Sequence, residues 1–241
     1  MLKTIWAVCI FSVAMAALES AVVVYLRALY YPDGFTVAFK LIDESIVKVE
    51  LLRELATLVM LAAIGYIAGK NLKDRFAFFL LSFAVWDIFY YAWLKILIDW
   101  PASFLEWDIL FLIPFTWLGP VWAPLICSMT MILLAVVLLC NPKPVLGSVW
   151  ALLCVGSAFI LFTFLQDYGW IIVSNGLIAD YANLLRNNHF IHLASGYIPG
   201  WYNWPVFLLG ELFLLLAVFK QYDYKSRKAK LDAVREKSLT L

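Results

Sequence analysis

Four acidic side chains lie inside long apolar stretches of the sequence, where a charge must be paired, neutralised or used. They are Glu19, Glu54, Asp87 and Glu211. An ionised carboxylate that faces lipid costs roughly 3 kcal/mol or more, so these side chains are expected to face the protein interior. Buried carboxyl groups can transfer a proton or bind a polar ligand. The four acids are therefore the first candidates for chemistry.

Asp87 stands near the middle of its apolar stretch, VWDIFYYAWLK. Tyr90 and Tyr91 follow it at i+3 and i+4, which places two phenols on its face of a helix. A carboxyl group flanked by phenols can be held as a hydrogen-bonded acid, which suits proton transfer. The same three residues could also form an ordinary polar contact between helices.

Basic side chains accompany the acids along the chain. Arg27 comes two turns after Glu19, and Arg53 adjoins Glu54. A guanidinium can neutralise a carboxylate or bind an anionic group of a ligand, although Arg53 would also fit the polar first turns of a helix. Asp87, Glu54 and Glu19 are the candidate catalytic residues. The candidate ligand-binding residues are Arg27, Arg53, Tyr90, Tyr91, Glu211 and Asp108.

Lys95 has a simpler explanation than these buried groups. It lies close to the end of its apolar stretch, and Asp99 follows it at i+4. A lysine can extend along apolar surface to reach water, and a carboxylate at i+4 is its natural helical partner. We therefore predict a surface ion pair between the two residues.

The two histidines of the chain, His189 and His192, have H-x-x-H spacing. On a helix they would share a face, and with nearby carboxylates they could bind a divalent metal. The spacing lacks the intervening glutamate of a metalloprotease motif and also fits ordinary surface histidines. A divalent metal is thus the one cofactor that the sequence suggests. Glycine-rich phosphate loops, multiple histidine boxes, G-x-S-x-G and paired-aspartate motifs are absent from it.

The composition identifies the environment of these residues. Hydrophobic residues make up 65% of the chain and charged residues 15%, with a mean hydropathy of +0.89. Soluble domains are about half apolar and a quarter charged, so the sequence predicts an integral membrane protein. The net charge of +1 and the lack of a basic face before the C-terminal tail exclude a nucleic-acid-binding protein.

Six segments are long and apolar enough for transmembrane helices, since a bilayer core of about 30 Å needs roughly 20 residues. They span residues 5–29, 47–69, 76–98, 119–140, 147–166 and 204–221. The sequence therefore predicts an all-α, polytopic helical bundle. Residues 1–222 would form one transmembrane domain, and residues 223–241 a basic tail.

The positions of lysine and arginine predict the orientation of this bundle. Twelve of them lie on the side that would carry both termini and six on the other, with Lys40 among the six. Positive residues favour the cytoplasm. We predict a multi-pass protein of a bacterial inner membrane with cytoplasmic N- and C-termini.

Two segments depart from this simple pattern. Proline and glycine interrupt the apolar stretch around 107–120, which predicts a broken half-helix that ends near Pro114 and restarts at Pro120. Irregular backbone at membrane depth is tolerated against protein or a wet cavity, so this segment argues for a cavity on the outer side. The alternative is an interfacial helix anchored by Trp107, Trp117 and Trp122. Residues 176–193 have helical amphipathic spacing, which predicts a helix lying on the outer surface.

The depths of the acids connect these features. At about 1.5 Å per residue, the four intramembrane acids lie roughly 14–22 Å above the cytoplasmic boundary. Similar depth on four helices favours a shared pocket that opens outward, in an enzyme or binding protein for a lipid-like or amphipathic ligand. Two alternatives stay open. One is a transporter of protons, ions or small solutes, and the other is a non-catalytic subunit or assembly factor of a larger membrane complex.

Overall fold

The protein is an all-α helical membrane bundle. The computed structural model describes residues 1–32, 34–37 and 44–239, and Lys40 and the tail side chains beyond Asp223 lie outside the described part. Six of the described helices are long and apolar enough to cross a membrane. These are α1 (Leu2–Tyr30), α2 (Glu44–Ala68), α3 (Leu72–Ile98), α4 (Trp122–Cys140), α5 (Gly147–Ser174) and α7 (Trp204–Leu239).

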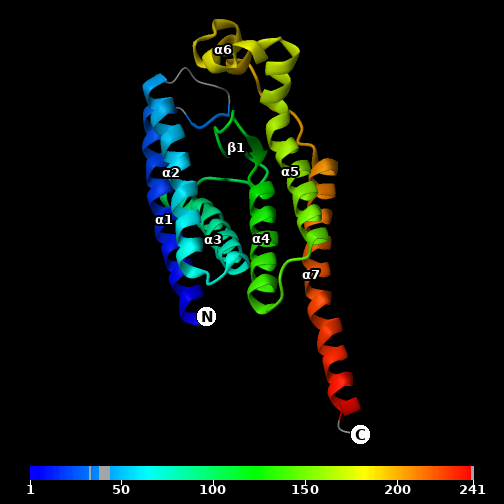
Figure 1. Cartoon of the computed structure of the whole chain (residues 1–241). Coiled ribbons are helices and arrows are strands. Elements are labelled where there is room, and N and C mark those ends of the chain that lie inside the picture. Colours follow the sequence, from blue (N-terminus) through cyan, green and yellow to red (C-terminus); the bar gives the residue numbers. More distant parts are fainter. Residues whose placement is uncertain (33, 38–43, 240–241) are drawn as a thin grey trace.

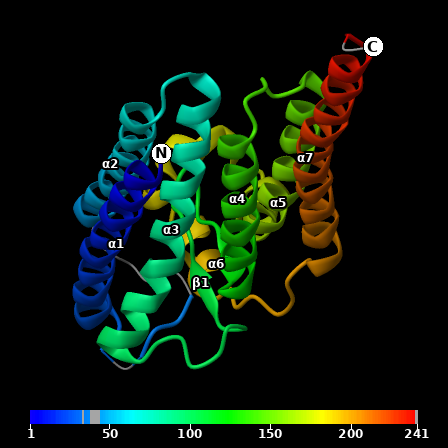
Figure 2. The ribbon, with the colours of Figure 1, turned by 90° about the horizontal axis from the view of Figure 1, so that it is seen from below.

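The helices form two groups of three that meet along α3 and α4 (Figures 1 and 2). In one group α1 and α2 pack on α3, and in the other α4 and α5 pack on α7. The N-terminus and the far end of α7 lie at the same end of the bundle, which we call the terminal end (Figure 1). The short helix α6 (Asn188–Ser195) covers the opposite end, the α6 end.

Helix α3 occupies the centre of the bundle, and local contacts define both of its ends. The Asn71 side chain accepts the Asp74 backbone N–H at 3.0 Å, which caps the first turn. At the other end Asp99 adopts a left-handed conformation with φ 52°, and its carboxylate lies 2.7 Å from the Lys95 ammonium. The predicted surface ion pair between Lys95 and Asp99 is therefore confirmed.

The terminal half of the bundle is filled by apolar side chains. Its buried side chains come from α1, α3, α4, α5 and α7, and Ile64 and Ala68 of α2 pack against them. The buried members of this cluster are Val8, Ala77, Phe78, Leu80, Leu81, Leu134, Ala135, Leu138, Val149, Leu153, Ala217 and Val218. Polar and charged cavity residues instead lie in the other half, toward the α6 end.

Helices α5 and α7 approach closely because both have glycine at their contact. A Cβ atom at Gly156 would lie 2.8 Å from the Gly210 carbonyl oxygen, and one at Gly210 would lie 2.7 Å from the Ile160 side chain. Small residues allow such close backbone approach in membrane bundles.

We expect Gly156→Ala to lower the free energy of unfolding by about 1–3 kcal/mol, because the new methyl group must push α5 away from α7. Chemical unfolding in mixed micelles measures this loss. Gly147→Ala is the matched control, since a Cβ at Gly147 has no neighbour within 4 Å. Equal stability of the two variants would contradict the proposed close packing.

The predicted broken half-helix is wrong, because residues 107–120 form a β-hairpin. Strand β1 (Trp107–Ile109) pairs antiparallel with β2 (Leu118–Pro120), and α4 begins at Trp122 rather than at Pro120. Cross-strand bonds satisfy the backbone polar groups in place of helical ones, including Leu110 N–H to Trp117 O at 3.0 Å. Residues 110–117 connect the two strands, and Pro114 lies in this loop, where it removes no donor from the strand pairing.

The predicted amphipathic helix over 176–193 is present as two short helices. A 3₁₀ segment, η1 (Leu177–Arg186), precedes α6, and Asn187 separates them. The Asn187 side chain accepts the N–H groups of His189 and Phe190, so it caps a new helix instead of continuing the first. The apolar faces of both helices pack on α5 at the α6 end.

Candidate functional site

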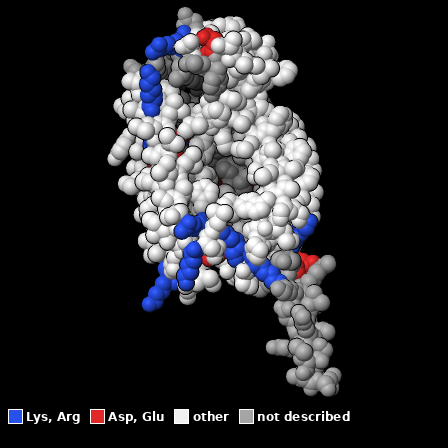
Figure 3. Space-filling model, viewed as in Figure 1, with Lys and Arg blue, Asp and Glu red and all other residues white. Residues whose placement is uncertain are grey.

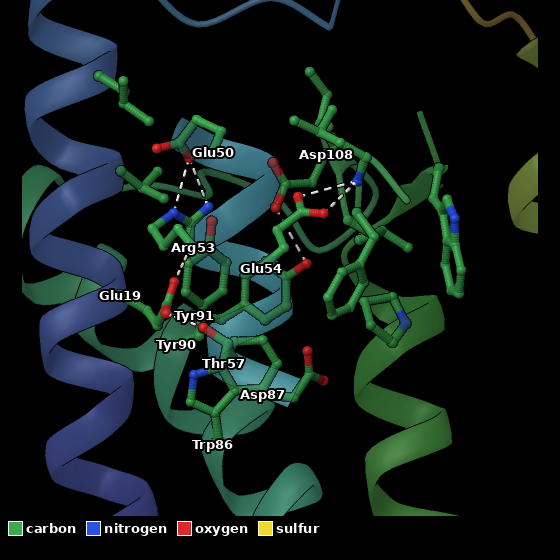
Figure 4. A pocket seen from close by; sticks show the side chains of 18 of the residues that line it. Glu19, Glu50, Arg53, Glu54, Thr57, Trp86, Asp87, Tyr90, Tyr91 and Asp108 are labelled. Carbon is green, nitrogen blue, oxygen red and sulfur yellow. Dashed lines mark hydrogen bonds and ion pairs between the residues drawn. The ribbon is translucent and has the colours of Figure 1, made fainter. Parts of the chain in front are cut away.

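A cavity of about 240 Å³ lies between α1, α2, α3, α4 and the β-hairpin (Figure 4). The structure brings together around it eight of the residues singled out in the sequence, from α1, α2, α3 and β1. They are Glu19, Arg27, Arg53, Glu54, Asp87, Tyr90, Tyr91 and Asp108. Their assembly in one cavity is the geometry expected of a binding or reaction site.

Arg53 joins α2 to α1 on one side of the cavity. Its guanidinium forms ion pairs with Glu19 on α1 and, at 2.8 Å, with Glu50 one turn earlier on α2. Thr57 donates its hydroxyl to the other oxygen of Glu19. Residues at i, i+3 and i+7 along α2 thus share the face that meets α1 (Figure 4).

A second charged group fastens the hairpin to the helices. The Arg27 guanidinium on α1 lies 3.3 Å from the Asp108 carboxylate on β1, and the Tyr91 hydroxyl donates to the same carboxylate at 3.2 Å. Phe35 and Trp100 lie over the guanidinium, 3.9 Å and 3.8 Å from its carbon. Such stacking stabilises a buried cation.

The Asp108 side chain is charged although it is only 3% exposed. Burial raises the pKa of this carboxyl to about 6, while the Arg27 guanidinium and the Tyr91 hydroxyl lower it. A carboxyl group with that pKa is mostly ionised at neutral pH. The contact between the hairpin and α1 is therefore a true ion pair.

Glu54 also binds the hairpin, through a backbone N–H group and not through a charged side chain. Both of its oxygens accept the Leu112 backbone N–H, at 3.0 Å and 2.9 Å. The side chain is buried, and the ion pairs of the described residues do not include it. Its hydrogen bonds therefore come from the hairpin backbone, and the Arg53 guanidinium acts on it only through space.

Asp87 lies at the other end of the cavity, beside α4. Ser128 on α4 donates its hydroxyl to this carboxylate at 2.7 Å. Among the described residues no cation pairs with Asp87. Tyr90 lines the cavity next to it, whereas Tyr91 donates to Asp108 instead. Of the two phenols predicted to flank Asp87, Tyr91 therefore bonds another carboxylate, and the hydroxyl that the described residues provide to Asp87 is that of Ser128.

Trp86 is a cavity residue that the sequence did not single out. It lies on the adjoining face of α3, is 7% exposed, and lines the cavity near Asp87 (Figure 4). Its indole N–H is buried and has no hydrogen-bond partner among the described residues. Thr57 and Ser128 were also missed. Helical spacing from Glu54 could have indicated Thr57, but Ser128 is identified only by the packing of α4 on α3.

Three predicted site residues lie outside the cavity. Glu211 is buried on α7, where it accepts the Thr130 hydroxyl of α4 at 2.7 Å. A carboxyl–hydroxyl pair of this kind fastens two membrane helices. His189 and His192 are exposed on α6. No group of three or more metal-ligating side chains occurs among the described residues.

Fold and site together define a multi-pass membrane protein with a charged cavity between its helices. Comparisons with known protein families, with curated proteins and with solved structures found no match to this chain.

Proposed function

We propose that the protein binds a lipid-like or amphipathic ligand in this cavity, as a membrane enzyme or a binding protein. It is a bacterial inner-membrane protein whose terminal end faces the cytoplasm and whose cavity opens toward the outer leaflet. Lysine and arginine gather at the terminal end, which supports this orientation (Figure 3).

The observation that carries the proposal is a charged cavity with aromatic walls at membrane depth. The polar groups sit among rings from α3, α5 and the hairpin, including Phe83, Phe111 and Phe164. Ligand sites commonly combine mostly apolar walls with a few placed polar groups. Figure 3 shows the surface hollowed between α2 and α4, so an apolar chain could extend sideways into lipid.

The apolar core of the terminal half favours a pocket over a transport path. A proton or ion path needs polar groups or water along its length. Below the cavity the buried side chains of α3 and α4 include Phe78, Leu81, Leu134 and Leu138, and none of the buried ones there is ionisable among the described residues. A cavity open at one end supports binding or reaction of a ligand more than its passage through the bundle.

We expect Asp87→Asn and Glu54→Gln each to remove ligand binding or turnover while the protein still folds. The amides can still accept from Ser128 and from the Leu112 backbone, but they lack the negative charge. Mass spectrometry of molecules that co-purify with the protein provides the assay. Asp99→Asn is the control, because Asp99 is exposed and asparagine also adopts its left-handed backbone.

If both variants retain the ligand at the level of the control, the cavity is not the ligand site. If wild-type protein and variants carry no specific molecule, and a second protein co-purifies with all of them, the chain is a subunit of a larger complex.

A further inference from the structure

The cavity holds more negative than positive side chains. Its acidic lining residues are Glu19, Glu50, Glu54, Asp87 and Asp108, whereas its basic residues are Arg27 and Arg53. Each guanidinium is already paired with the wall, Arg27 with Asp108 and Arg53 with Glu19 and Glu50. Two further nitrogens of Arg27, Nε and Nη1, are buried without a hydrogen-bond partner among the described residues, so a ligand oxygen could accept from them as well.

Glu54 and Asp87 form no ion pair among the described residues, although Arg53 acts on Glu54 through space. An unpaired carboxylate at this depth is stabilised by a positive partner. The arginines cannot supply it without breaking their own ion pairs. The positive charge that these two carboxylates lack can therefore come from the ligand. A cationic head group suits this cavity better than an anionic one.

The walls of the cavity suit an organic cation. Trp86 and Tyr90 line the cavity together with Asp87 and contact each other. Phe83 packs on Trp86 and stacks on Phe111 of the hairpin. An ammonium group gains from aromatic faces as well as from a carboxylate. The same fold already holds one cation between two rings, since Phe35 and Trp100 enclose the Arg27 guanidinium.

The indole N–H of Trp86 is independent of these charges and also indicates a ligand. It is a hydrogen-bond donor on a side chain that is 93% buried, lines the cavity and has no partner among the described residues. A buried donor without a partner costs about 1–3 kcal/mol. A ligand oxygen close to the ammonium would accept this hydrogen bond.

The size of the cavity limits how much of the ligand it encloses. A volume of about 240 Å³ is below the roughly 300–1,000 Å³ of pockets that enclose drug-sized ligands. A head group and a few methylene groups fit, but a whole lipid does not. The rest of an alkyl chain would leave through the hollow between α2 and α4 (Figure 3).

We propose that the ligand is an amphipathic amine: an ammonium head with a neighbouring oxygen acceptor and an alkyl chain. Asp87 and Glu54 bind the ammonium group, Trp86 donates to the oxygen, and the chain lies between α2 and α4. This inference rests on the proposed function. A free long-chain amino alcohol and a lipid with an ethanolamine head share this chemistry.

Three probes with one chain length separate the kinds of head group. N-decylethanolamine, decanol and decanoate are added to the protein in phosphatidylglycerol nanodiscs, and binding is followed by the midpoint of thermal unfolding. We expect N-decylethanolamine to bind about tenfold more tightly than either of the others. Asp87→Asn and Glu54→Gln should each weaken it about tenfold, and Trp86→Phe about threefold. Asp99→Asn should leave it unchanged.

A second arm distinguishes the two sources of the amine. Nanodiscs that contain phosphatidylethanolamine should compete with N-decylethanolamine if a lipid head occupies the cavity, and should not compete if the ligand is a free amine.

Each contrary result has its own meaning. Tightest binding of decanoate, unaffected by Asp87→Asn, would overturn the amine but leave the proposed pocket. Equal binding of all three probes would do the same. Absence of binding by all three, together with wild-type protein that carries no molecule, would overturn the proposed function itself. Trp86→Phe retains every charge, so it tests the site even if a carboxylate variant fails to fold.

Discussion

Asp108→Asn is expected to lower the free energy of unfolding by about 3–5 kcal/mol, because it leaves the Arg27 guanidinium buried without its counter-charge. The pair is well shielded from water, with 10% and 3% of the two side chains exposed. Asparagine keeps the size of the side chain and an acceptor for the Tyr91 hydroxyl. The loss would thus report the missing charge rather than a cavity.

Asp108→Asn should also loosen the packing of the hairpin on α1, because Asp108 forms the ion pair between them. The amides of Leu110 and Trp117 are bonded across the hairpin, and their hydrogen exchange should become faster than in the wild type. Chemical unfolding in mixed micelles measures the stability, and hydrogen exchange with mass spectrometry measures the loosening.

A double variant distinguishes the ion pair from a general effect of substitution. Arg27→Met together with Asp108→Asn removes both charges, and the methionine can pack between Phe35 and Trp100. We expect the double variant to be about 2–3 kcal/mol more stable than the sum of the two single losses predicts. Additive losses would show that the pair contributes no coupling.

Hydropathy was sufficient to predict the six spans, because membrane insertion depends on local apolar length and not on distant contacts. The ends were less accurate: α5 continues to Ser174, where the prediction ended at 166. Helical turns that extend beyond the bilayer need not be apolar, so hydropathy does not predict where such a helix ends. The hairpin was missed for a related reason, since its strands are three residues long and depend on pairing with each other.

Depth and helical spacing also predicted which side chains gather in the cavity. Glu19, Glu54 and Asp87 are on three helices at similar depth, and the structure brings them to one cavity. Their partners could not be predicted, because a helix-to-helix contact depends on the rotation of each helix about its axis. Glu211 shows this limit: it lies at a similar depth, but α7 directs it to Thr130 and away from the cavity.

Arg53→Gln is expected to destabilise the protein by about 3–5 kcal/mol, because two carboxylates lose their common cation. Arg53 is the described ion-pair partner of both Glu19 and Glu50, which would then repel each other beside the cavity. Glu19→Gln should cost only about 1–2 kcal/mol, because the amide oxygen still accepts from Thr57 and Arg53 keeps Glu50.

Arg53→Gln is expected to cost more stability than Glu19→Gln because Arg53 pairs with two carboxylates, whereas Glu19 pairs with one cation. The double variant tests this explanation. With Glu19→Gln already present, Arg53→Gln removes the cation from one carboxylate instead of two. The double variant should therefore be more stable than Arg53→Gln alone, although it carries an additional substitution. Chemical unfolding of the three variants in mixed micelles gives the comparison. A double variant less stable than Arg53→Gln would mean that Glu19 stabilises the bundle through its hydrogen bond with Thr57 more than through its charge.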